Sequence, residues 1–134
     1  MEGHPDDPSI SDATELYRRI HPRHHITWDD NRGAWRVKSA AFQNTTGTKS
    51  MSVALGDVLQ AAGRSPTTVL ALYPDWYLAS LTARFVRQHD QGLLREPTDE
   101  EPAHGAVVGE KRESVKRAFA REARWVVAPE EGRD

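Results

Sequence analysis

The spacing of apolar residues changes along this chain, and that change constrains the fold more than any other feature. Met51, Val53 and Leu55 alternate with small or polar residues, which is the period expected for a strand with one buried face. Further along, Val115 and Phe119 belong to an apolar stripe that recurs every four residues, as on one side of a helix. A chain with both periods predicts an α+β fold.

The strands are expected to be short, and one pair should form a hairpin. Residues 29–33 read Asp-Asp-Asn-Arg-Gly, and these residue types favour a chain reversal at the tip of that hairpin. The sequence therefore predicts a small mixed or antiparallel sheet of about five or six strands, built from residues 16–20, 25–28, 35–42, 51–55, 93–96 and 105–108.

Three or four helices are expected beside this sheet. Asp57 can cap the first, Ser65 and Pro66 form a start signal for the second, and Pro74 separates the second from the third. The last helix is predicted to be amphipathic and basic, with Phe119 and, just beyond it, Trp125 as anchors of the core. The predicted ranges are 57–62, 65–73, 76–90 and 111–123.

The length of 134 residues predicts one domain. Residues 1–13 are acidic and poor in apolar side chains, so we expect a disordered leader, followed by a domain over 14–128 and a frayed tail over 129–134. The N-terminus does not resemble a signal peptide, and no apolar run is long enough to span a bilayer. We therefore expect a cytoplasmic protein that is not embedded in a membrane.

The chain contains no cysteine, which excludes disulfides, thiolate nucleophiles and cysteine-ligated metal sites and favours a reducing compartment. His21, His24 and His25 lie close together, but adjacent residues of a strand point to opposite faces and no zinc-binding pattern is present. We expect exposed loop histidines and predict neither a metal site nor a cofactor.

The formal net charge of −2 hides a basic C-terminal segment. Opposite the apolar stripe of the last predicted helix lies a basic ridge made of Lys111, Arg112, Lys116, Arg117, Arg121 and Arg124. With the Arg- and His-rich region of the first strand, it suggests a non-catalytic binding module for an anionic partner. The partner would be a protein, encoded nearby in the genome, or a nucleic acid, although a solvated helix face explains the same charges. The oligomeric state stays open.

An enzyme acting on a nucleotide or on NAD is the alternative. Arg18 or Arg19 on the first strand, followed by Ser39, resembles in outline the sites of ADP-ribosyltransferase-like folds, and His104 and Lys111 would complete a pocket. That resemblance implies an arginine holding a phosphate and a serine supporting the nicotinamide end. A convincing acidic catalytic residue is missing, since Glu96 and Glu113 are only positional candidates.

A series of short motifs resembles a family of small uncharacterised bacterial proteins. The motifs are LYRRIHP at 16–22, SAAF at 39–42, MSV at 51–53, PAH with VVGEK within 102–111, and the AxWVV pattern at 123–127. The resemblance covers nearly all of the expected domain and implies a stand-alone domain. It implies no particular activity.

Overall fold

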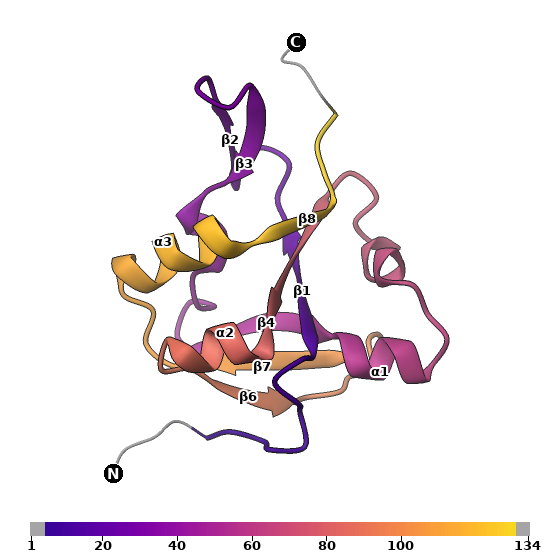
Figure 1. Cartoon of the computed structure of the whole chain (residues 1–134). Helices are drawn as coiled ribbons and strands as arrows, with labels where there is room; N and C mark the ends of the chain where they lie inside the picture. The colour runs from indigo at the N-terminus through magenta and orange to yellow at the C-terminus, as the bar shows by residue number, and fades with distance from the viewer. Residues whose placement is uncertain (1–4, 131–134) are drawn as a thin grey trace.

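A six-stranded antiparallel sheet forms the centre of the molecule (Figure 1). The computed structural model describes residues 5–130. The strands lie in the order β6-β7-β4-β1-β5-β8, so the first strand of the chain is in the interior of the sheet. Their bounds are Gly92–Arg95, His104–Val108, Ser50–Leu55, Glu15–Ile20, Tyr77–Thr82 and Arg124–Val127, in that order.

A separate hairpin and short helices surround this sheet and confirm the predicted α+β fold. The hairpin pairs β2 with β3, and none of the helices between residues 5 and 130 has the length and apolar character needed to cross a membrane. The bounds are Ile26–Asp29 (β2), Ala34–Val37 (β3), Gly56–Ala61 (α1), Ala83–Gln88 (α2) and Glu113–Glu122 (α3), with 3-10 helices at Ser39–Phe42 (η1) and Pro66–Leu70 (η2).

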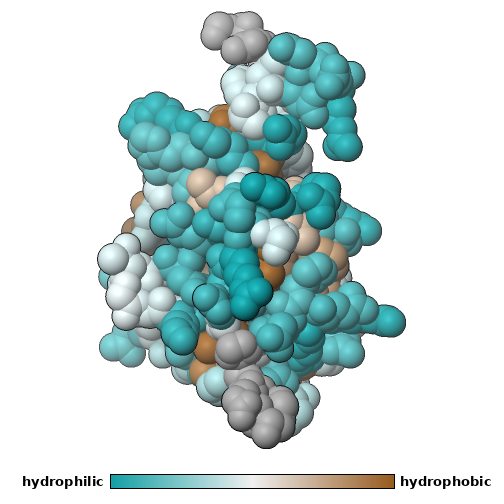
Figure 2. All heavy atoms as spheres, turned by 90° about the vertical axis from the view of Figure 1, so that its left-hand side faces the viewer, coloured by the Kyte–Doolittle hydropathy of each residue, from teal (hydrophilic) through white to brown (hydrophobic). Residues whose placement is uncertain are grey.

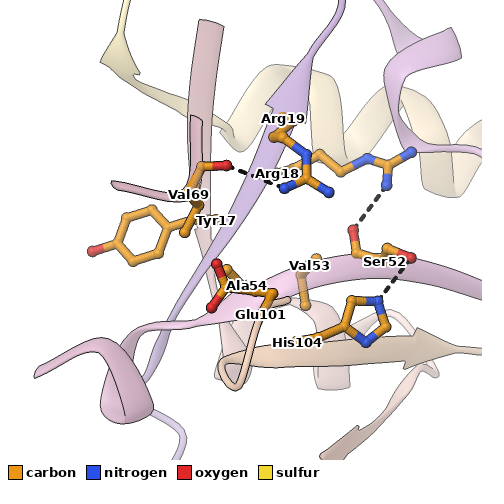
Figure 3. A pocket seen from close by; sticks show the side chains of 9 residues that line it. All are labelled: Tyr17, Arg18, Arg19, Ser52, Val53, Ala54, Val69, Glu101 and His104. Atoms are coloured by element: carbon orange, nitrogen blue, oxygen red, sulfur yellow. Dashed lines mark hydrogen bonds between the residues drawn. The ribbon is translucent and has the colours of Figure 1, made fainter. Parts of the chain in front are cut away.

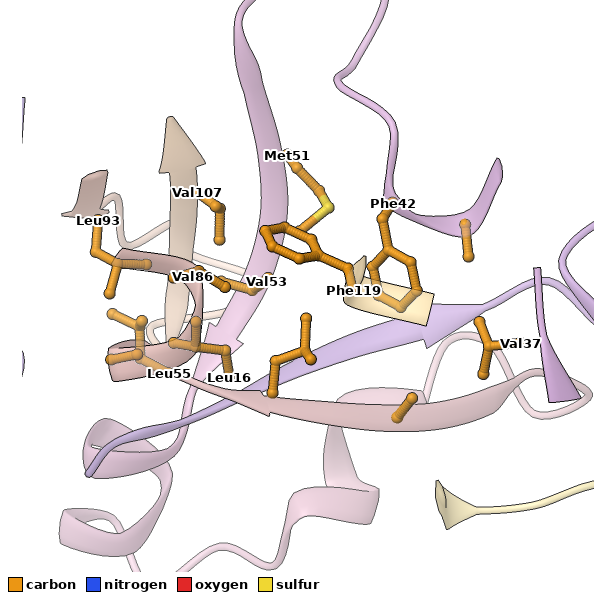
Figure 4. Close-up of a cluster of buried hydrophobic side chains, with 14 of the residues drawn as sticks. Leu16, Val37, Phe42, Met51, Val53, Leu55, Val86, Leu93, Val107 and Phe119 are labelled. Atoms are coloured by element: carbon orange, nitrogen blue, oxygen red, sulfur yellow. The ribbon is translucent and has the colours of Figure 1, made fainter. Parts of the chain in front are cut away.

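Alternation along the strands supplies two clusters of buried side chains. Leu16 and Ile20 of β1 are fully buried in the larger cluster, whereas Tyr17, between them, packs against the smaller one. Since successive side chains of a strand point to opposite faces, each face of the sheet carries one cluster. Figure 4 shows the larger cluster around Phe42 and Phe119.

Helix α3 covers the larger cluster, as its apolar stripe predicts. Phe119 is fully buried, and its ring centre lies 6.0 Å from that of Phe42 and 5.9 Å from that of Phe85. Trp125 is partly buried and packs against the same cluster. The helix, however, ends at Glu122, and the chain then continues as strand β8.

The helix predicted for residues 76–90 is wrong in its first half. Residues 77–82 form β5, which pairs with β1 along the whole length of both strands, and only residues 83–88 are helical. The four residues between Tyr77 and Thr82 are all buried, so the strand has no alternating pattern and its leucines mimic helical spacing. Thr82 marks the change, because its hydroxyl accepts a hydrogen bond from the Phe85 amide at 3.1 Å.

Smaller differences affect three other predicted elements. The second hairpin strand does not run on through Phe42, because residues 39–42 turn into η1 and bury both Ala41 and Phe42. The helix predicted over 65–73 is the shorter 3-10 helix η2. Asp57 lies in the first turn of α1 and does not cap it.

The predicted disordered leader does not hold for residues 5–13. Ile10 is fully buried in the larger cluster, and the Asp7 amide donates to the Leu93 carbonyl at 2.7 Å. Arg87 of α2 pairs with the carboxylates of Asp6, at 3.1 Å, and Asp12, at 2.8 Å. Residues 5–12 thus pack against α2 and β6. The rest of the predicted leader, and residues 131–134 of the predicted tail, lie outside the described residues.

The β2-β3 hairpin turns where its sequence predicts. The Asp29 carboxylate accepts a hydrogen bond from the Asn31 amide at 3.0 Å, and Gly33 adopts a φ of +62°, a conformation that glycine adopts without strain. The indole nitrogen of Trp125 donates to the Trp35 carbonyl at 3.2 Å. This bond joins the hairpin to β8.

Candidate functional site

The sheet opens between β1 and β4, and Arg18 occupies the opening (Figure 3). These two strands pair only at Leu16 with Leu55 and at Tyr17 with Ala54. Beyond that point the Arg18 guanidinium replaces the ladder, because its Nη1 donates to the Ser52 carbonyl of β4 at 2.8 Å. Its Nε donates to the carbonyl of Ala41, in η1, at 2.9 Å. One arginine thus ties β1 to two separate elements.

The charge of Arg18 has no carboxylate partner among residues 5–130. Its pKa is lowered to about 10 by burial first and by the nearby Arg19 cation second. A guanidinium with that pKa is still charged at neutral pH. Its Nη2 makes no hydrogen bond within the described chain. Arg18 is therefore a partly buried cation with one group of donors left for an anion.

Arg19 points to the other face of β1, where it borders a small pocket. Its Nη1 donates to the Val69 carbonyl at 3.2 Å, and its guanidinium carbon lies 4.2 Å from the centre of the Tyr73 ring. The cation and the ring attract each other at this distance. Two contacts thus position Arg19 while it keeps free donors.

Ser52 and His104 form a hydrogen-bonded pair in the same pocket. They project from neighbouring strands, since Ala54 of β4 lies opposite His104 of β7. Ser52 Oγ is 3.1 Å from His104 Nε2, and His104 Nδ1 is 2.8 Å from the Glu96 carbonyl oxygen. A carbonyl oxygen only accepts, so the hydrogen of neutral His104 is on Nδ1 and its Nε2 accepts from the Ser52 hydroxyl.

The pocket has a volume of about 40 Å³ and a polar lining (Figure 3). Glu101 contributes the only carboxylate, and both of its oxygens already bind Arg64, at 2.7 and 2.9 Å. That pairing is the largest cause of the lowered pKa of Glu101. The lining residues are Tyr17, Arg18, Arg19, Ser52, Val53, Ala54, Val69, Glu101 and His104.

Three of the residues proposed for an enzymatic pocket thus line one pocket, and the other two do not. Arg18, Arg19 and His104 are in the lining, but the Ser39 hydroxyl donates to the Glu113 carboxylate at 3.1 Å and is outside it. Lys111 has a structural role, because its ammonium donates to the Asn44 side chain and to two carbonyls of the β7 end at 2.6 to 3.0 Å. Burial and the Arg18 cation lower the pKa of Lys111 to about 8.

The basic ridge is less continuous than the sequence predicts. Helix α3 begins only after Lys111 and Arg112, and Arg124 lies beyond its end, in β8. Glu113 partly neutralises the first turns, with its oxygens 3.3 Å from Lys116 and 3.8 Å from Arg117. Arg121 and Arg124 are exposed and make no ion pair within residues 5–130.

The histidine cluster forms a hydrogen-bonded turn. His21 Nδ1 accepts hydrogen bonds from the amides of Arg23 and His24, and His25 Nδ1 accepts from the His21 amide at 3.0 Å. No group of three metal-ligating side chains occurs among residues 5–130. His21 and His25 therefore bind backbone groups of their own turn, and the His24 ring stacks on that of His21.

Stability should depend on the protonation of His25. Burial first, then the charges of Arg18 and Lys38 and the neighbouring histidines, lower its pKa to about 4. Because its pKa in the unfolded chain is about 6.5, the unfolded state binds more protons between these values. The free energy of unfolding should therefore fall as pH falls from about 6.5 towards 4. Urea denaturation at pH 7 and pH 5 measures this, and His25→Asn should reduce the difference. An equal difference in both proteins would exclude His25 as its source.

Ser52, Tyr17 and Glu101 are pocket residues that the sequence analysis missed. Ser52 reads as the ordinary outward-facing position of an alternating strand. Arg18, Ala41, Ser52 and His104 lie in the short sequence motifs at 16–22, 39–42, 51–53 and 102–104. In the fold these motifs are connected by the hydrogen bonds of Arg18 and His104.

Comparison of the chain with protein-family models, with curated proteins and with solved structures found no match.

Proposed function

We propose that the protein binds an anionic partner and that Arg18 and Arg19 receive its anionic group. The observation that carries this proposal is the partly buried guanidinium of Arg18, which has no carboxylate partner in the described chain and retains free donors beside a pocket. Burial strengthens its interaction with an anion, because the effective dielectric constant near the protein is lower than that of water. In this proposal the protein is the binding module that the sequence predicts, and its main contact with the partner is made by Arg18 and Arg19 of β1.

Phosphate is the anion that suits these donors best. A guanidinium presents paired N–H groups that match the oxygens of phosphate or carboxylate, and Ser52 lines the same pocket. The pocket of about 40 Å³ is small, so most of the partner would remain outside it. A terminal phosphate of a nucleotide or of a nucleic acid fits this description.

Titration calorimetry with inorganic phosphate, a nucleoside 5′-monophosphate and a short oligonucleotide tests the proposal. A charge-assisted hydrogen bond is worth about 1.5–3 kcal/mol, so Arg18→Met should weaken binding by about 10- to 100-fold. Arg19→Met should weaken it too. The matched control is Arg84→Met, because Arg84 is exposed in α2, away from the pocket lining. Absence of binding at low salt, or equal effects of all three substitutions, would contradict the proposal.

A second candidate is a nucleic-acid surface along α3. Exposed Arg121 and Arg124 favour it, and the side of the molecule to the left in Figure 1 is mostly hydrophilic (Figure 2). Such binding would be sequence-tolerant and weakened by salt. With labelled DNA or RNA, the variant Arg117→Glu, Arg121→Glu should bind less tightly, and its salt slope should fall by about one per arginine. If the variant binds as tightly as the wild type, the surface along α3 does not bind nucleic acid, and the pocket beside Arg18 remains the proposed anion site.

A further inference from the structure

We propose that the pocket between β1, β4 and β7 is a hydrolytic site in which Ser52 is the nucleophile and His104 its general base. The substrate class is a short acyl ester with an anionic group. That the substrate carries an anionic group rests on the proposed function, in which Arg18 and Arg19 bind an anion. The nucleophile and its base rest on separate contacts.

The hydrogen-bond chain has the direction that nucleophilic catalysis requires. The Glu96 carbonyl holds the hydrogen of neutral His104 on Nδ1, so the lone pair of Nε2 faces Ser52 Oγ at 3.1 Å. A serine activated by a histidine that a third group orients is the general arrangement of a serine nucleophile. Here a backbone carbonyl takes the orienting role.

The pair is accessible and rigidly placed. Ser52 and His104 both line the pocket, and both are only half-buried. They belong to β4 and β7, which pair along the whole of β7. The backbone at Ser52 is also fixed by Arg18, which donates to the Ser52 carbonyl at 2.8 Å (Figure 3). Little reorganisation is therefore needed to present the hydroxyl to a ligand.

The surroundings suit an acyl transfer with developing negative charge. The guanidinium of Arg19 borders the pocket with free donors, and that of Arg18 lies beside the Ser52 backbone. Fixed cations close to a developing oxyanion lower the energy of the transition state. The one carboxylate in the lining, Glu101, binds Arg64 with both oxygens, and its Coulombic interaction with Arg19 is the smaller one.

The reaction balances without a further cofactor. Ser52 Oγ attacks the carbonyl carbon of the ester, and its proton passes to His104 Nε2. The bond between that carbon and the leaving alcohol breaks, and the alcohol takes the proton from Nε2. Water, activated by the same nitrogen, then hydrolyses the acyl-serine and releases the carboxylic acid, which restores the Ser52 hydroxyl.

The size of the pocket selects the acyl group. A cavity of about 40 Å³ is small and leaves room for a short acyl group such as acetyl. Tyr17 borders both this pocket and a wider groove of about 460 Å³, whose walls include Gln60 and Pro66. The alcohol portion of the substrate would therefore extend past Tyr17.

Two measurements on the full chain test the inference. p-Nitrophenyl acetate hydrolysis should fall by about 100-fold or more in Ser52→Ala and in His104→Gln, the scale of a lost nucleophile or base. A fluorophosphonate probe, followed by peptide mass spectrometry, should label Ser52 in the wild type. The control is Ser39→Ala, which removes an exposed hydroxyl outside the pocket and should change neither result. Unlabelled Ser52, or hydrolysis equal to that of Ser52→Ala, would overturn the inference.

Ser52→Cys keeps the test decisive if the alanine variant unfolds. The natural chain has no cysteine, so this substitution introduces a single thiol. Beside His104 that thiol should react with iodoacetamide at lower pH than the thiol of Ser39→Cys, because a nearby histidine favours the thiolate. Equal pH profiles would overturn the role of His104. Phosphate binding with an unreactive Ser52 would reject the hydrolytic site alone, and a reactive Ser52 without phosphate binding would reject the proposed function alone.

Discussion

Deletion of residues 1–12 is expected to lower the free energy of unfolding by about 4–6 kcal/mol. Ile10 is fully buried in the larger cluster, and truncation of a buried isoleucine to alanine alone costs about 2–5 kcal/mol. The deletion also removes both carboxylates that pair with Arg87 and the backbone bond from Asp7 to Leu93. In thermal unfolding of a chain of this size, the midpoint should fall by about 15–25 °C.

Two point substitutions test whether the packing of residues 5–12, and not merely the shorter chain, accounts for the loss of stability. Ile10→Val should cost only about 0.5–1.5 kcal/mol, because most of the buried side chain is retained. Gly92→Ala should destabilise more, since its added methyl group would run into the Pro5 carbonyl. An unchanged midpoint in the deleted chain would show that residues 5–12 do not contribute to the folded state.

Phe119→Ala is expected to cost about 3–5 kcal/mol, the usual range for a buried aromatic side chain. The ring lies between those of Phe42 and Phe85, at centre distances of 6.0 and 5.9 Å, so its loss leaves a cavity enclosed on several sides. Leu72→Ala is the matched control, because Leu72 is 72% exposed and its truncation should stay within about 0.5 kcal/mol. Urea denaturation measures both, and similar losses would mean that Phe119 does not anchor the core.

The parts of the fold that the sequence predicts are those with one buried face. Strand β4 alternates in burial over most of its length, and α3 carries its apolar residues every four positions, so both have a clear period. Strand β5 lies inside the sheet and is buried on both faces, which removes the alternation and leaves helix-like spacing. Ile10 is one apolar residue in a polar segment, and no local pattern indicates where it docks.

The site could be predicted only in part, because strand order decides which residues meet. The residue types and sequence positions of Arg18, Arg19 and His104 indicate them as candidate site residues. Ser52 becomes their neighbour only because β4 lies between β1 and β7. Its hydrogen bonds join it to Arg18, 34 residues earlier in the sequence, and to His104, 52 residues later. Ser39 follows β3 in the sequence, but the turn into η1 places it outside the pocket.

The docking of the N-terminal segment has a consequence for the order of folding. Its ion pair with Arg87 spans 75 residues from Asp12, and its bond with Leu93 spans 86 residues from Asp7. At a synthesis rate of about 5–20 residues per second, the ribosome needs roughly 4–15 s to make that stretch. During this interval Ile10 has no finished cluster to enter. Contacts so distant in sequence also slow refolding. Residues 5–12 are synthesised before the elements that they contact, and they can reach their native positions only after those elements have been made.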